Sequence, residues 1–364
     1  MSMFSRRTRT AAAVGLTAIA LIAASPAADA ASATPGTGAS AFLARELVRT
    51  GHHLTTTFSG TAYPDYGLTA DAILALDAAK TSQREAVRST SYLGSHITDY
   101  IGAGAEKYAG ASAKALVVAL AQRRANPGHL GGVNLTARVI HLMNDHGRFA
   151  DQSAFGDFSN TFSQAFSIIG IKKAGRGVDA KAISFLLRQQ CPGGGFRLNE
   201  VNPKCTDRTT ADPDATSMAI QALNAVHPTT ASRKAVTAAQ AFLVKDRAGN
   251  GGFHGGPTTP AVNSNSTSLA IIALANSGRP RVISSARAYL LRMQYGCAFP
   301  SAFVGAVAYK AAAKAEAAAG GASARPVDQD RRSTTQAVLG LTGTPLIDIS
   351  NAGAKKTAVA IKCG

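Results

Sequence analysis

The chain has 364 residues, of which 46% are hydrophobic, with a formal net charge of +17 and no tryptophan. This length and apolar content suffice for one large buried core. The positive charge favours contact with anionic polymers or lipid headgroups. No nucleic-acid-binding motif accompanies it, which excludes nucleic acid as a partner.

The first 30 residues have the three parts of a secretory signal peptide. Three arginines within residues 6–9 precede an apolar stretch, 11–24, that is too short to span a bilayer. Small residues then offer cleavage sites within 30–33. We therefore expect residues 1–30 to be removed on export, by the Sec route rather than the twin-arginine route. The alternative interpretation is a buried N-terminal helix.

The mature protein is expected to be secreted, with no stable membrane span. Removing residues 1–30 takes away three Arg and one Asp and leaves 35 basic against 20 acidic residues. This excess makes anionic cell-wall polymers candidate partners, so cell-wall association is a further expectation.

After a short linker, 31–38, residues 39–364 are expected to form one domain of about six helix-pair repeats. One segment of each repeat starts with small residues and is then apolar on nearly every side, as in a helix that is buried all round. These inner-helix segments are 68–76, 112–120, 161–169, 215–223, 266–274 and 333–341, of which 161–169 is the loosest match.

A second kind of helix precedes each inner one. It carries Arg, Lys or Glu between apolar residues at helical spacing, which is typical of an amphipathic outer helix. Gly-rich turns that end in Phe close several of these helices, because Gly stops the helix and Phe can dock beneath the neighbouring pair. The outer segments are 41–50, 91–101, 135–143, 182–190, 239–246 and 286–294, and the turns are 146–149, 189–196, 249–253 and a degenerate copy at 294–299.

No repeat shows a strand pattern. A ring of inner helices wrapped by outer helices satisfies both helix types, so the sequence predicts an all-α fold, a closed six-hairpin α/α toroid. An open solenoid is the alternative, but it would not need one helix set this uniformly apolar. The last repeat carries an Ala/Gly-rich insertion at about 304–326, whose core is expected to form an extra surface helix.

Four cysteines lie in the exported part: Cys191, Cys205, Cys297 and Cys363. An even number in an oxidising compartment indicates two disulfides, with three connectivities open. We favour Cys191–Cys205, within one inter-helix loop, and Cys297–Cys363, which ties the C-terminus to the last repeat. Neither pair has the CxxC spacing of a zinc or redox site, and we expect no metal or cofactor.

The Gly-Gly-Phe turns, followed by DPDATSMAIQAL at 212–223, resemble the prenyltransferase and squalene-oxidase repeat superfamily. The resemblance covers about residues 39–345. It implies a six-hairpin α/α toroid, the fold of terpene cyclases, of protein prenyltransferase β-subunits and of cobalamin carriers. Because functions diverge widely on one scaffold, the repeat is specific for the fold and weak for activity.

A class II terpene cyclase of this superfamily uses a DxDD motif, whose middle Asp protonates an alkene or epoxide. The resemblance places Asp214 at the proton-donor position and Asp212 at the first acid, whereas Ala215 replaces the last acid. Such a donor must be kept protonated by burial and a neighbouring acid. A polyene cyclase also needs aromatic faces for its cations, and this chain is only 6% aromatic.

This chain lacks the catalytic residues that other enzymes of the superfamily require. A protein prenyltransferase β-subunit needs an Asp two residues before a zinc-binding Cys, and none of the four cysteines has one. Thioester-bearing toroids carry GCGEQ, which the segment YGCAF at 295–299 does not match. A glycosidase needs two carboxylates in a cleft, and glutamate is scarce. These considerations favour a protein that is not an enzyme.

The acids near residue 212 also have a structural explanation. Asp212 aligns with Asp65, Asn263 and Asp330, all placed just before an inner helix. Asp or Asn at that position is what N-capping requires, because the side chain accepts from free backbone N–H groups. We therefore favour capping over unique chemistry for this position.

The preferred hypothesis is an exported toroid that binds a small amphipathic or anionic ligand in its central cavity without catalysis. Aligned helix N-termini at one rim would favour a polar or anionic group. Cobalamin carriers bind a ligand on this fold with an added β-domain, so a separate β-domain partner is also considered. The alternatives are a class II terpene cyclase-like enzyme that uses Asp214 and a cell-wall-associated structural protein.

Overall fold

The computed structural model describes residues 33–201 and 203–363. The predicted signal peptide, 1–30, and the first residues of the predicted linker lie outside the described residues, so the domain boundary there stays a prediction. Among the helices that are described, none is long and apolar enough to cross a membrane.

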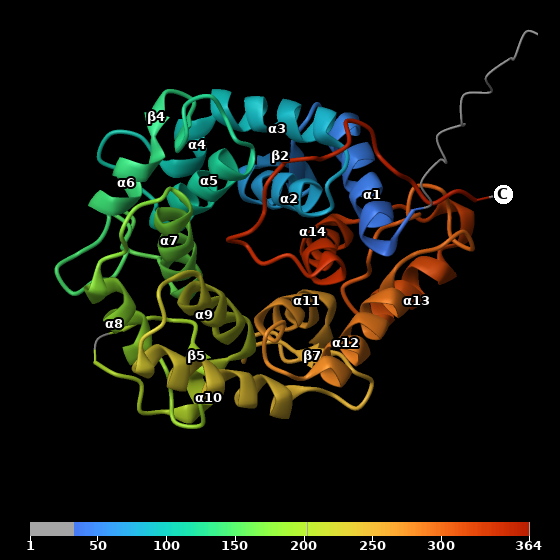
Figure 1. Cartoon of the computed structure of the whole chain (residues 1–364). Coiled ribbons are helices and arrows are strands. Elements are labelled where there is room, and N and C mark those ends of the chain that lie inside the picture. The colour runs from blue at the N-terminus through green and yellow to red at the C-terminus, as the bar shows by residue number, and fades with distance from the viewer. Residues whose placement is uncertain (1–32, 202, 364) are drawn as a thin grey trace, which may run out of the picture. The chain divides into compact units, whose positions relative to one another are not determined.

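Six helices form a closed inner ring (Figure 1). Each packs against the next in chain order, and the last, α14, packs against the first, α2, which closes the ring. The predicted closed toroid is therefore confirmed, and the open solenoid is excluded. The inner helices are α2 (Tyr66–Ala78), α5 (Ala109–Ala121), α7 (Thr161–Lys173), α9 (Pro213–Ala225), α11 (Ser264–Ala273) and α14 (Asp328–Thr342).

The remaining long helices wrap the inner ring from outside (Figure 1). The first of them, α1, packs against both α14 and α2, so the two ends of the repeat array are joined by outer as well as inner contacts. The outer helices are α1 (Pro35–Arg49), α3 (Gln83–Ser95) with the short α4 (Ile97–Ile101), α6 (Leu135–His141), α8 (Ala180–Arg188), α10 (Thr230–Asp246) and α12 (Pro280–Met293).

Burial follows the two sequence patterns. Ten of the 13 residues of α9 are buried, whereas only three of the nine in α8, the outer helix before it, are buried. Helices apolar on every side need neighbours on every side, while amphipathic ones need a single buried face. The predicted inner and outer roles are thus confirmed.

Short antiparallel hairpins, which the sequence did not predict, join many of the helices. Three of the four lead into inner helices, and two of these pair the Phe of a Gly-rich turn with the residue that caps the next helix, as in Phe196 opposite Asp212. Three of the hairpins have strands of two residues, which are too short for a period-two pattern to show. The strands of the first hairpin, β1 and β2, have five residues each, so the expectation that no repeat contains a strand is wrong there. The strands are β1 (Leu54–Phe58), β2 (Thr61–Asp65), β3 (His129–Leu130), β4 (Val133–Asn134), β5 (Phe196–Arg197), β6 (Ala211–Asp212), β7 (Phe253–His254) and β8 (Val262–Asn263).

The Gly-rich turns bind one repeat to the next. Gly194 has a φ of +98°, and a Cβ at this position would lie 2.4 Å from the carbonyl oxygen of Ala238 in α10. Phe196, two residues later, is fully buried, and its N–H donates to Thr216 Oγ1 at 2.8 Å. Glycine therefore allows the turn to approach the next outer helix while Phe docks beneath the pair, as predicted.

Two disulfides, Cys191–Cys205 and Cys297–Cys363, join the cysteines in the predicted pairs, and they are compatible with a secreted protein. Within the Ala/Gly-rich segment, residues Ala311–Ala319 form α13, none of whose residues is buried. Two short 3-10 turns, η1 (Arg208–Thr210) and η2 (Gly321–Ser323), complete the described elements.

Candidate functional site

Equivalent positions of the six inner helices face the centre of the ring. Six residues at or near the helix starts occupy equivalent positions in the repeats. They are Asp65, Tyr108, Asn160, Asp212, Asn263 and Asp330. The sixth residue after each of these lines a cavity of about 110 Å³ in the middle of the ring. These six residues are Asp71, Lys114, Phe166, Met218, Leu269 and Gln336.

The structure corrects the predicted register of two inner helices. For α5 the segment equivalent to 215–223 is 111–119, one residue earlier than predicted, and for α7 it is 163–171, two residues later. The small-residue starts misled the alignment because the cap residues differ. Asp151 from another loop accepts from the first N–H of α5, and the cap of α7 is Asn160.

A second set of positions lies one helical turn nearer the helix starts, on the same face. In the first turns of α7, α9 and α11, which are otherwise buried, these are the residues that keep some exposure: Phe162, Asp214 and Asn265. The equivalent residue of α14 is the exposed Arg332, and α2 and α5 have glycine there. Three of these six positions therefore carry polar or charged side chains. We call the space inside the ring the channel and its end at these positions, near the helix N-termini, the mouth.

The C-terminal segment runs into the ring of inner helices (Figure 1, red), and its Leu346 supplies part of the wall of the cavity. This residue is only 3% exposed and lies in that wall with Leu74 and Leu339. The Lys173 ammonium at the end of α7 donates to the carbonyls of Ile347 and Ile349 at 2.7 and 2.6 Å. We call residues 344–357, which continue across the C-terminal ends of α2 and α5, the C-terminal plug.

Ion pairs line one side of the channel. Lys114 lies 2.7 Å from Asp71, and Arg332 lies 2.5 Å from Asp65 at the mouth. Burial is the largest single influence and acts to lower the pKa of Lys114, but the charge and hydrogen bond of Asp71, together with Tyr100 and Asp65, outweigh it and hold that pKa above its usual value. Each of these two cations is thus already paired with an acid.

Asp212 and Asp214, the two candidate catalytic residues, have different surroundings. Asp212 caps α9, since its Oδ1 accepts from the N–H groups of Asp214 and Ala215 at 2.8 and 2.9 Å. Asp214 does not cap the helix. Burial raises its pKa to about 7, against the Ser266 hydroxyl, which lowers it, and with help from the charges of Asp212 and Asp246.

Capping explains most of the recurring acids, as the sequence suggested. Asp65 and Asn263 accept from backbone N–H groups at the starts of α2 and α11. Asp330 differs from the prediction because α14 begins one turn earlier. Its carboxylate lies inside the first turn, where it accepts from the N–H of Val327 and from the Tyr295 hydroxyl.

The methyl of Ala215, at the third acid of the DxDD pattern, is fully buried. No second carboxyl group is therefore supplied from that position to support Asp214. The described residues also contain no cluster of three or more His, Cys, Asp or Glu side chains that could hold a metal ion.

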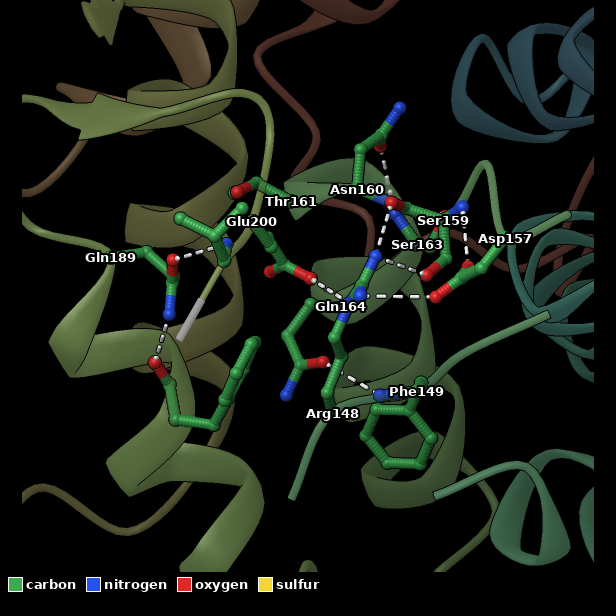
Figure 2. A network of polar contacts seen from close by, with 12 residues as sticks. Arg148, Phe149, Asp157, Ser159, Asn160, Thr161, Ser163, Gln164, Gln189 and Glu200 are labelled. Atoms are coloured by element: carbon green, nitrogen blue, oxygen red, sulfur yellow. Dashed lines mark hydrogen bonds and ion pairs between the residues drawn. The ribbon is translucent and has the colours of Figure 1, made fainter. Parts of the chain in front are cut away.

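A buried acid that sequence reasoning missed is Glu200, in the loop closed by Cys191–Cys205 (Figure 2). Its side chain is 0% exposed and lies 3.6 Å from Arg148, which also pairs with Asp157 at 3.0 Å. Burial raises the pKa of Glu200 to about 8, although Arg148 and Thr161 oppose the shift. This network ties the loop to the start of α7, and no sequence motif marks it.

The channel residues had a signal in the sequence. Asp71 and Gln336 stand at the fourth position of the aligned inner segments, where the equivalent residues are mainly apolar. A polar residue in an otherwise apolar helix indicates a face that meets polar groups or solvent. Lys114 was missed because its segment was aligned one residue too late, which placed Ala115 instead of Lys114 at the fourth position.

Comparison with known structures shows which solved proteins have a similar fold. The chain matches no protein-family model and no curated protein. A protein from Actinoplanes is similar, with a TM-score of 0.59 and 16% identity over 85% of this chain and 99% of that one. Type II terpene cyclase MstE from Scytonema superposes with a TM-score of 0.60 and 14% identity, covering 84% of this chain and 96% of the cyclase.

The fold is the terpene cyclase-like α/α toroid. Haptocorrin in complex with Cbi shares it, with a TM-score of 0.50 and 11% identity over 86% of this chain and 68% of haptocorrin. At these identities the likeness establishes the fold alone, and the similar structures include both a terpene cyclase and a protein in complex with Cbi. The residues of the channel must therefore carry any functional argument.

Proposed function

We propose that this chain is an exported protein that binds a small amphipathic ligand in the mouth of the channel without transforming it. Three of the six mouth positions are polar or charged, and one side of the wall below is apolar. An amphipathic molecule would place its polar end at the mouth and its apolar end against Leu269, Leu339 and Met218. Pockets of this kind orient a ligand by a few polar groups and gain affinity from apolar contact.

The observation that carries this proposal is the floor formed by Leu346. With the C-terminal plug in place, the central cavity is about 110 Å³, smaller than the pockets of roughly 300–1,000 Å³ that enclose larger ligands. A short chain or a small head group fits this space, whereas a folded polyprenyl chain does not. The aromatic side chains in the wall, Phe162 and Phe166, are also few for stabilising a cyclising cation.

Native mass spectrometry of the protein purified from its own culture medium tests the proposal. The expected result is a bound small molecule that is released on denaturation. Enlarging the channel by Leu346→Ala should change which molecules bind, while Leu291→Ala, on the surface of α12, should leave them unchanged. Identical binding by protein in which the mouth and floor are both altered would contradict the proposal.

One observation favours a second candidate, a terpene cyclase-like activity. Asp214 is a largely buried acid with a pKa of about 7, and the resemblance places it at the proton-donor position. A general acid with a pKa near the working pH is suited to proton transfer. Conversion of a polyprenyl substrate by the parent, lost in Asp214→Asn, would establish this activity and overturn the binding-only proposal.

Cell-wall association and a separate β-domain partner are further proposals. The net charge supports contact with anionic cell-wall polymers. Co-sedimentation with purified cell walls should then weaken steeply as the salt concentration rises, because exposed charges are screened. A structural role alone would show such binding together with no small molecule in the channel.

A further inference from the structure

Three oxygen atoms on the channel side of α9, α11 and α14 are screened from solvent and have no hydrogen-bond partner among the residues described, although the Ser266 hydroxyl lies close enough to the Asp214 carboxyl to lower its pKa. They are Asp214 Oδ1, Asn265 Oδ1 and Gln336 Oε1. Buried polar atoms are nearly always paired, and leaving one unpaired costs about 1–3 kcal/mol. Three unpaired acceptors in one region therefore indicate a group that donates to them.

The three side chains belong to one sector of the ring. Their helices, α9, α11 and α14, are consecutive neighbours. Asp214 and Asn265 stand one turn above Met218 and Leu269, which line the cavity together with Gln336. Side chains on a helix lean toward its N-terminus, so the long Gln336 side chain extends from its lower position toward the level of the other two.

The charge of this sector is negative, although the chain as a whole is strongly basic. The charged groups that shift the pKa of Asp214 are both acids, Asp212 and Asp246. The two cations of the channel, Lys114 and Arg332, contact Asp71 and Asp65 instead. The helix N-termini alone would favour an anion, but the side chains of this sector present acceptors and negative charge.

We infer that the ligand of the channel carries a primary ammonium group, which donates its three hydrogens to Asp214, Asn265 and Gln336. This inference rests on the proposed function and names the polar end of its ligand. An ammonium group has three donors and no acceptor, which matches three unpaired oxygens. Its charge would also be compensated by Asp214, because a buried cation needs a counter-ion. This differs from the anionic ligand that the aligned helix N-termini alone would favour.

Ammonium binding would change the ionisation of Asp214. A cation beside this carboxyl favours its charged form and lowers its pKa, which is about 7 in the unliganded protein. Binding near neutral pH therefore releases a proton, and affinity should fall as the pH drops below 7. The titratable groups that face Asp214 are Asp212 on its own helix, Asp246 from α10 and Tyr309.

Isothermal titration of the mature chain with three probes of equal chain length tests the inference: hexylammonium, hexanoate and hexanol, at constant ionic strength and pH 8. Hexylammonium should bind about tenfold more tightly than either other probe, a difference that corresponds to one charge-assisted contact. Its affinity should decline toward pH 5.5, while that of hexanol stays constant.

Matched variants locate the site. Asp214→Asn should reduce the affinity for hexylammonium to about that of hexanol, within roughly twofold, whereas Asp179→Asn, an exposed cap on α8, should change nothing. Hexanoate or hexanol binding as tightly as hexylammonium would overturn the ammonium inference and leave the binding function intact. Failure of all three probes to bind would overturn the proposed function itself.

Discussion

The backbone N–H of Leu346 donates to Gln221 Oε1 at 3.2 Å. This hydrogen bond joins the segment after the last inner helix, α14, to the fourth inner helix, α9. This bond sets the depth of the channel, because it places the Leu346 side chain in the cavity wall. The repeat pattern alone implies an open hole through the ring. The depth of that hole is determined by a segment outside the repeats.

Leu346→Ala should therefore destabilise the protein by about 2–4 kcal/mol, through lost apolar contact and an enlarged cavity. Unfolding in urea would measure the change. Leu291→Ala is the control, since that side chain is 47% exposed on α12 and its loss should cost less than about 1 kcal/mol. Equal losses in the two variants would show that Leu346 is not packed as described.

Asp214→Asn should stabilise the protein at pH 8 and have little effect at pH 4. The pKa of this carboxyl is about 7 in the folded protein, against about 3.9 in an unfolded chain. Between these values the unfolded chain binds fewer protons, so the stability of the parent falls as pH rises. Asn removes this loss, and a gain on the order of 2 kcal/mol is expected at pH 8.

Thermal melting of parent and variant from pH 4 to pH 8 would measure that difference. Asp179→Asn provides a comparison, because Asn caps a helix about as well as Asp and should leave the melting curve nearly unchanged. A difference between parent and Asp214→Asn that does not grow with pH would contradict the buried, protonated state of Asp214.

The ring of inner helices could be predicted from the sequence, but the arrangement of residues inside the channel could not. Inner segments such as 215–223 and 266–274 were predictable because apolar residues on every side require burial on every side. The role of Asp212 as a cap was predictable because the same residue type recurs at helix starts. Both conclusions depend on periodicity and local chemistry, which a single sequence displays.

The channel contents depend on distant contacts. Leu346 lies outside the repeats, and its place in the cavity follows from hydrogen bonds to helices more than 100 residues away. Glu200 meets Arg148 only because a loop folds back over the start of α7. The pairing of Lys114 with Asp71 needs the register of α5, which small-residue matching placed one residue late.

Gly194→Ala should be far more damaging than Gly193→Ala. Both glycines have φ near +97°, a conformation that costs an L-residue about 1–2 kcal/mol. A Cβ at Gly193 meets nothing within 4 Å, whereas one at Gly194 lies 2.4 Å from the carbonyl oxygen of Ala238. Alanine at 194 must therefore push the turn away from α10, and we expect a loss of roughly 3 kcal/mol or more.

Chemical denaturation of the two single variants isolates this close approach, because the backbone strain is common to both. Similar losses would mean that the turn does not rest on α10. Aggregation of Gly194→Ala alone, with Gly193→Ala folded and soluble, would also support the close approach of the turn to α10.

The last prediction concerns the buried Glu200 and the half-buried Arg148 beside it in Figure 2. At pH 9, where Glu200 with its pKa of about 8 is charged, Arg148→Gln should destabilise the protein by about 3 kcal/mol, because it leaves the fully buried carboxylate without its nearest cation. Glu200→Gln should cost much less, since burial already holds the pKa of this carboxyl at about 8 and the neutral form is favoured at pH 7. In the Glu200→Gln background, Arg148→Gln should lose only its bonds to Asp157 and Ser159. A double-mutant cycle at pH 9 should then give a coupling of about 1 kcal/mol or more, and the coupling should shrink at pH 7, where Glu200 is mostly neutral. Strict additivity of the two changes would show that Arg148 supports Asp157 and the loop rather than Glu200.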